Sequence, residues 1–169
     1  QARRPWAGLR VLEVGCGHGG GARCLAALLG PEAYVATDFS SVSIAACRQW
    51  HDRLLQPLPI TYEHVDGTEL TERFGPASFD LAVMVQSAHA IIDAERLCTG
   101  LSHVLRPGGT LLLADHLKEM RWEHLRARLD AVGIGCQRAD DLTEFVAEQR
   151  WLPPDMRYVA ARFCRGPRC

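Results

Sequence analysis

Hydrophobic positions along the chain form short apolar runs that alternate with longer segments of helical spacing. Apolar runs of strand length lie at residues 10–14, 34–37, 60–65, 79–85 and 110–114. Segments with apolar residues three or four apart predict helices at residues 22–29, 42–55, 91–105 and 121–132, with one or two turns at 70–74. Weaker patterns predict strands at 134–138 and 157–164, with a helix at 141–149 between them.

This alternation of strands and helices indicates the fold class. Strands that are separated by helices pair in parallel, and the helices then cover both faces of the sheet. We therefore expect an α/β protein with a Rossmann-like, doubly wound, mostly parallel sheet and an antiparallel C-terminal edge strand. A chain of 169 residues is expected to form a single domain, here residues 1–169.

Composition and charge narrow the classes of function. The chain is 47% hydrophobic and 23% charged, as in ordinary globular proteins, and its net charge is −1. That balance gives no electrostatic reason to expect a nucleic-acid partner, and the apolar runs are too short for a membrane span, so a cytoplasmic location is expected. Seven cysteines without a Cys-x-x-Cys pair favour reduced thiols over a disulfide framework or a zinc site.

A glycine-rich loop follows the first predicted strand, in the segment Val11-Leu-Glu-Val-Gly-Cys-Gly-His-Gly-Gly-Gly21. Glycines allow a tight turn and the close approach of a ligand to the backbone. The pattern Gly15-x-Gly17-x-x-Gly20 fits a dinucleotide fingerprint, in which a helix N-terminus binds a pyrophosphate. Glu13 at the strand end argues against that ligand, because its carboxylate would repel a pyrophosphate and suits a cationic ligand.

Polar residues follow five successive predicted strands. Ligands of such sheets bind beyond the carboxyl ends of the strands, so these residues are expected to meet at one edge. They comprise the loop from Glu13 to Gly19, Asp38-Phe39, Asp66-Gly67, the segment from Gln86 to His89, and Asp115-His116. Asp38 lies about 20 residues beyond the glycine loop, the spacing expected of an acid that binds ribose hydroxyls.

Four segments resemble motifs of the class I S-adenosylmethionine (SAM) methyltransferases: VLEVGCGHGGG, VATDFS, HVDGTEL, and FDLAVMVQSAHA with HVLRPGGTLLLAD. The resemblance implies SAM as cofactor and S-adenosylhomocysteine (SAH) as product. It implies that the glycine loop holds the methionine part and that Glu13 meets its amino group, directly or through the loop. It also implies that Asp38 binds the ribose and Asp66 the adenine amino group. The residues expected to bind the cofactor are Glu13, Gly15, Cys16, Gly17, Gly19, Asp38, Phe39, Asp66, Gly67 and Gln86. A bound metal ion is not expected.

More narrowly, GCGHGGG, Ser-Ala-His after the fourth strand and the closing MRYVAARF resemble the phthiotriol and phenolphthiotriol dimycocerosate methyltransferases. This resemblance implies O-methylation of a small-molecule, polyketide or lipid hydroxyl. The chain departs from that family by a short link between Asp141 and Arg157 and by the lack of N-terminal helices. We therefore expect a shortened region over the acceptor.

His89 is the expected catalytic base. It follows the fourth strand, where the methyl group of the cofactor should point, and a neutral imidazole can accept a proton near pH 7. Asp115 and His116, after the fifth strand, are the alternatives. Two other functions stay open at this stage: a nicotinamide-dependent oxidoreductase, which the glycine spacing alone favours, and a methyltransferase-like domain that binds a ligand without catalysis.

Overall fold

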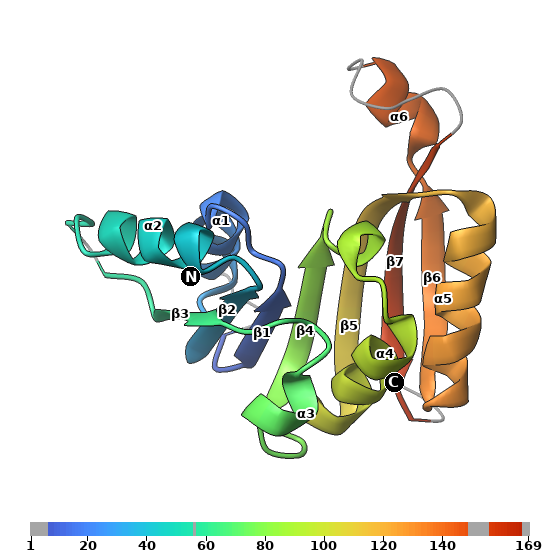
Figure 1. Ribbon diagram of the computed structural model, residues 1–169, viewed down its shortest axis with the longest axis horizontal. Coiled ribbons are helices and arrows are strands. Elements are labelled where there is room, and N and C mark those ends of the chain that lie inside the picture. Colours follow the sequence, from blue (N-terminus) through green and yellow to red (C-terminus); the bar gives the residue numbers. More distant parts are fainter. Residues whose placement is uncertain (1–6, 56, 149–155, 167–169) are drawn as a thin grey trace.

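The computed structural model describes residues 7–55, 57–148 and 156–166. Its strands are β1 (Arg10–Val14), β2 (Ala33–Asp38), β3 (Ile60–His64), β4 (Phe79–Val85), β5 (Leu105–Leu117), β6 (Ile134–Asp141) and β7 (Arg157–Arg165). Its helices are α1 (Gly20–Leu29), α2 (Ser41–His51), α3 (Leu70–Arg73), the 3-10 turn η1 (Ala88–Ala90), α4 (Ala94–Val104), α5 (Glu119–Ala131) and α6 (Thr143–Glu148). Strands and helices alternate along the chain, as the sequence pattern predicts (Figure 1).

The seven strands form one sheet in the order β3-β2-β1-β4-β5-β7-β6. The pairs from β3 to β5 are parallel, and β7 is antiparallel to both of its neighbours. The predicted doubly wound, mostly parallel sheet with an antiparallel C-terminal edge is therefore confirmed. The last strand, β7, lies inside that edge, because it inserts between β5 and β6 (Figure 1).

Two apolar clusters, one on each face of the sheet, hold the helices in place. Successive side chains of a strand point to opposite faces, so Val11 of β1 joins one cluster while Leu12 and Val14 join the other. The first cluster packs α1 and α2 against β1 and β2, and the second packs α3, α4 and α5 against β4, β5 and β7. Helix α6 lies beyond the ends of β6 and β7, away from the sheet (Figure 1).

Several predicted boundaries differ from the structure for local reasons. Helix α4 begins at Ala94 and not at residue 91 as predicted. Asp93 caps its N-terminus by accepting a hydrogen bond from the Arg96 amide, so the residues before Asp93 lie outside the helix. Strand β5 begins at Leu105, before the predicted strand at 110–114, and its pairing with β4 shifts in register between Leu105 and Thr110. Gln149, in the predicted helix 141–149, lies outside the described residues.

The cysteines and the helix lengths bear on two further expectations. Cys16, Cys24, Cys47, Cys98 and Cys136 are free, as expected. The prediction of reduced thiols is wrong at Cys164, which is disulfide-bonded, because sequence spacing alone does not reveal which thiols lie close in space. Among the described residues, the helices are all too short or too polar to cross a lipid bilayer.

Candidate cofactor and acceptor site

A cavity of about 500 Å³ lies at the carboxyl ends of β1, β2, β3 and β4. Its size is that of pockets that bind small-molecule cofactors. Seven of the predicted binding residues line it: Gly15, Gly17, Asp38, Phe39, Asp66, Gly67 and Gln86. The structure therefore brings together residues from four separate strand ends, as the strand-end rule predicts.

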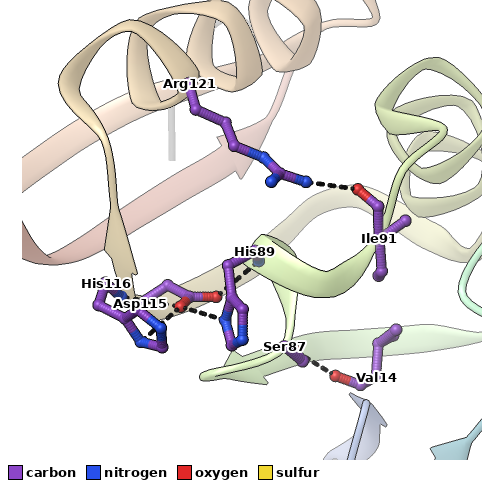
Figure 2. Close-up of polar contacts among 7 residues, drawn as sticks. All are labelled: Val14, Ser87, His89, Ile91, Asp115, His116 and Arg121. Carbon is purple, nitrogen blue, oxygen red and sulfur yellow. Dashed lines mark hydrogen bonds and ion pairs between the residues drawn. The ribbon is translucent and has the colours of Figure 1, made fainter. Parts of the chain in front are cut away.

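The glycine loop is fixed to the neighbouring strands by backbone contacts. The amides of Gly15 and Cys16 both donate to the carbonyl of Thr37 at the end of β2, at 2.8 Å each. Gly15 has a φ of +81°, and a Cβ there would lie 2.3 Å from Cβ of Ser87. The Ser87 hydroxyl donates to the Val14 carbonyl at 2.6 Å (Figure 2). Gly15 is therefore required by the packing between the ends of β1 and β4.

Gly17 differs from Gly15, because the space that a side chain at this position would occupy is empty. Its φ is +52°, and a Cβ at this position would meet no atom within 4 Å. Its amide donates to Oδ2 of Asp38 at 2.8 Å, while Oδ1 of Asp38 accepts from the Ser40 amide at 2.9 Å. The Asp38 carboxylate thus holds the loop and lies at the cavity wall.

Asp66 lines the far end of the cavity, beyond β3. Its Oδ1 accepts hydrogen bonds from the amide and the hydroxyl of Thr68, at 2.8 Å each. This arrangement fixes the carboxylate and leaves Oδ2 for a donor on a ligand. Phe39 also lines the cavity and is 68% exposed, so one ring face is available for contact with a flat group.

Three predicted binding residues are not among the residues that line the cavity: Glu13, Cys16 and Gly19. Glu13 is 3% exposed, and it accepts a hydrogen bond from the Tyr34 hydroxyl at 2.9 Å. Burial raises the pKa of the Glu13 carboxyl to about 7; the Tyr34 hydrogen bond opposes this shift, and the charge of Asp38 adds to it. A Cβ on Gly19 would lie 2.8 Å from Sγ of Cys47, so packing explains this glycine. The expectation that these three residues bind the cofactor stays a prediction.

His89, Asp115 and His116 form a polar cluster (Figure 2). They are not among the residues that line the cavity, but His89 lies in sequence between Ser87 and Ala90, which are. The Asp115 carboxylate is fully buried and lies 2.8 Å from Nδ1 of His89, and it also accepts from the amides of His89 and His116. The His116 ring lies against the His89 ring, with the centroids 4.1 Å apart. The predicted base and its two alternatives are thus one cluster, in which the buried carboxylate orients His89.

Sequence reasoning missed part of the cavity wall, in particular Ile91 and Ile92. The prediction placed both in a helix, whereas they lie in the link between η1 and α4 and line the cavity. Arg121 of α5 donates a hydrogen bond to the Ile91 carbonyl at 2.9 Å, and this bond connects the link to α5 (Figure 2). Asp93 was the available signal, since an aspartate before a helical run predicts an N-cap and leaves the two isoleucines outside the helix.

Comparison with known proteins identifies the class. A family model described as a methyltransferase domain matches residues 11–109. The phthiotriol/phenolphthiotriol dimycocerosates methyltransferase of Mycobacterium leprae is 29% identical over 92% of this chain and 60% of that protein. The fatty-acid O-methyltransferase of Mycolicibacterium smegmatis is 39% identical over 64% of this chain and 37% of that protein. The chain belongs to the class I SAM-dependent methyltransferase family, and it spans less than two thirds of the length of each of these relatives.

Solved structures agree on the fold. A SAM-dependent methyltransferase from Mesorhizobium loti superimposes with a TM-score of 0.75 at 18% identity, over 95% of this chain and 92% of that chain. The [4+2]-cyclase SpnF also superimposes with a TM-score of 0.79, at 21% identity, over 95% of this chain and 75% of that chain. Because a cyclase shares the fold, the fold alone does not define the reaction, and the argument for the reaction depends on the site.

Proposed function

We propose that the protein binds SAM in the cavity and transfers its methyl group to a hydroxyl of a small-molecule, polyketide or lipid acceptor. The observation that carries this proposal is the order of the polar groups along the sheet. Asp66 follows β3, Asp38 follows β2, the glycine loop follows β1, and the His89–Asp115 pair lies over β4 and β5. A ligand that runs along this edge passes from carboxylates to a histidine that is poised to accept a proton.

The cavity wall fits SAM in its polar groups and its space. Oδ2 of Asp66 is placed to accept from the adenine amino group, and the Asp38 carboxylate is placed to accept from the ribose hydroxyls. The open side of Gly17 leaves room for the ligand against the backbone. With the adenine at the β3 end, the sulfonium group lies toward β4, next to Gln86 and Ser87. Bound SAM supplies a methyl group that its sulfonium has already activated.

His89 is then the residue that removes the proton from the acceptor. Its Nδ1 is engaged by Asp115, which favours the tautomer with the proton on Nδ1 and leaves the Nε2 lone pair available. With SAM bound in this way, the acceptor oxygen would bond to the methyl carbon as the carbon–sulfur bond breaks, and SAH would be the leaving group. The hydroxyl proton passes to Nε2 of His89 and later to solvent. The buried Asp115 stabilises the imidazolium that forms.

An apolar acceptor is favoured by the surface around the cavity. Phe39 and Ile92 line the cavity yet are 68% and 96% exposed. Exposed apolar side chains at the mouth of a site offer contact area to an apolar ligand. The two relatives named above are named for lipid-type acceptors, a phthiotriol dimycocerosate and a fatty acid. We therefore propose a long-chain acceptor with a hydroxyl oxygen as the methylated atom.

Two measurements test the proposal in order. Calorimetric titration with SAH and, in parallel, with NAD⁺ should give binding of SAH alone. Methyl transfer from radiolabelled SAM should then be measured against fatty acids, phenols and hydroxylated polyketides. Binding of NAD⁺ in preference to SAH would reject the cofactor assignment. SAH binding without transfer to any acceptor would favour a domain that binds the cofactor but does not catalyse.

A further inference from the structure

The ligand atoms of His89, Asp115 and His116 have a spacing suited to a metal ion. Each residue offers one ligand atom, and these atoms all lie within 4.8 Å of one another. Oδ1 of Asp115 lies 2.8 Å from Nδ1 of His89 and 3.5 Å from Nδ1 of His116. Ligand atoms about 2.0–2.1 Å from one ion at octahedral or tetrahedral angles are separated by about 2.9–3.4 Å. The two separations from the carboxylate therefore bracket those of a metal site.

We propose that His89, Asp115 and His116 form a binding site for one divalent transition-metal ion, such as Zn²⁺ or Co²⁺. Two imidazole nitrogens and one carboxylate oxygen are the ligand set of many such sites, whereas Mg²⁺ and Ca²⁺ prefer sites made of oxygen alone. Three protein ligands leave at least one coordination position open. Binding of the ion needs only these three residues, whereas its effect on methyl transfer, described below, rests on the proposed role of His89 as the base.

The surroundings of the carboxylate prepare it to act as a ligand. Asp115 is fully buried, and the backbone amides of His89 and His116 donate to its oxygens at 3.1 and 2.8 Å. Hydrogen bonds of this kind fix the orientation of a ligating carboxylate and raise the affinity of a site. The two imidazoles cover it from outside, with side chains 35% and 26% exposed. An ion can therefore reach the cluster from solvent, and a small ring rotation adjusts the separation of the two nitrogens.

The ion and the orienting hydrogen bond are mutually exclusive. Nδ1 of His89 donates a proton to Asp115 in the arrangement that supports its role as a base, whereas a ligand nitrogen must be unprotonated. Binding of the ion at Nδ1 therefore moves the remaining imidazole proton to Nε2, the nitrogen that would accept the proton of the acceptor. We expect the ion to inhibit methyl transfer while leaving SAH affinity unchanged. The site would act as a metal-dependent control on the reaction.

Cobalt titration of the purified chain tests the site directly. The expected result is binding of one Co²⁺ per chain, with weak visible absorption bands and without the intense near-ultraviolet band of cobalt bound to thiolate, and with displacement by Zn²⁺. His116→Gln and Asp115→Asn should each weaken Co²⁺ binding at least tenfold, since the first removes an imidazole ligand and the second removes the negative charge of the carboxylate ligand. His124→Gln is the matched control, because His124 is an exposed histidine of α5 outside the cluster.

SAH titration of the same variants separates a lost ligand from a lost fold. Asp115→Asn and His116→Gln that still bind SAH with wild-type affinity are folded, and their loss of Co²⁺ then supports the site. Three results would overturn the proposal: no stoichiometric Co²⁺ or Zn²⁺ binding, a thiolate band that places the ion on cysteine, or binding that His116→Gln leaves intact. Each of these can occur with normal SAH binding and methyl transfer, so failure here is distinct from failure of the proposed function.

Discussion

Replacing Glu13 by glutamine should change the pH dependence of stability in a direction that the structure fixes. Glu13 is 3% exposed and has the Tyr34 hydroxyl as its hydrogen-bond donor, and burial raises the pKa of its carboxyl from the usual 4.5 to about 7 in the folded protein. A carboxyl with a raised pKa binds its proton more tightly in the folded than in the unfolded chain. Its contribution to the free energy of unfolding is therefore fully present below about pH 4.5 and is lost as the pH rises through about 7.

The magnitude follows from the shift. A difference of about 2.5 pKa units corresponds to about 3 kcal/mol between the two pH limits, and about 2–3 kcal/mol of it falls between pH 5 and pH 8. Glutamine keeps an oxygen that can accept from the Tyr34 hydroxyl, but it cannot ionise. Its buried NH₂ group costs about 1–3 kcal/mol if it finds no partner, and that cost is the same at every pH. The difference between the two pH values therefore isolates the charge.

Urea unfolding followed by circular dichroism at pH 5 and pH 8 provides the assay. We expect Glu13→Gln to gain about 2–3 kcal/mol in stability relative to the wild type on going from pH 5 to pH 8. Glu32→Gln is the control, because Glu32 is exposed, and it should show no such gain. An equal effect of Glu13→Gln at both pH values would refute the reasoning, since it would mean that the Glu13 carboxylate is solvated or paired with a cation.

Four further substitutions test the glycine loop, Asp38 and the proposed base, His89. Asp38→Ala should weaken SAH binding at least tenfold by calorimetry, because it removes an acceptor for ribose and releases the Gly17 amide; affinity within about twofold of wild type would reject the ribose role. Gly17→Val should abolish SAH binding while the circular dichroism spectrum stays that of a folded protein, since its side chain would enter the open space. Gly15→Ala should lower the urea midpoint because its Cβ meets Ser87, and adding Ser87→Gly should restore part of the loss. His89→Gln should reduce methyl transfer about 10²–10⁴-fold in a radiolabel assay with SAH affinity unchanged, and full activity would move proton removal elsewhere.

The sequence predicts the sheet and the cavity wall well because both depend on local pattern. Strands β1 and β4 have the predicted bounds, and Asp38, Asp66 and Gln86 reach the cavity because the carboxyl ends of parallel strands share one edge. The hydrogen bond between His89 and Asp115 joins residues 26 apart, and sequence alone ranks them as alternatives instead of partners. Such contacts depend on how β4 and β5 align, which periodicity does not encode.

Glu13 illustrates the opposite limit. Its position at the end of β1 predicts a cofactor contact, and in the structure the side chain is buried and accepts a hydrogen bond from Tyr34 of β2. The alternation of a strand does not reveal that a neighbouring tyrosine reaches the same interior space. The insertion of β7 between β5 and β6 is likewise invisible to pattern, because edge and interior antiparallel strands have similar alternation.

The position of β7 has a consequence for the order in which the molecule can be completed. Asp115 and His116 pair with Val159 and Tyr158 of β7, so the strand that carries them gains its second neighbour from the final described segment of the chain. During synthesis, β1 to β4 can come together around the glycine loop while the side of β5 that later pairs with β7 is still an unpaired edge. The residues that line the cavity, all between Val14 and Asp93, are thus encoded early in the chain. The framework behind the histidine–aspartate pair is completed only when β7 has left the ribosome.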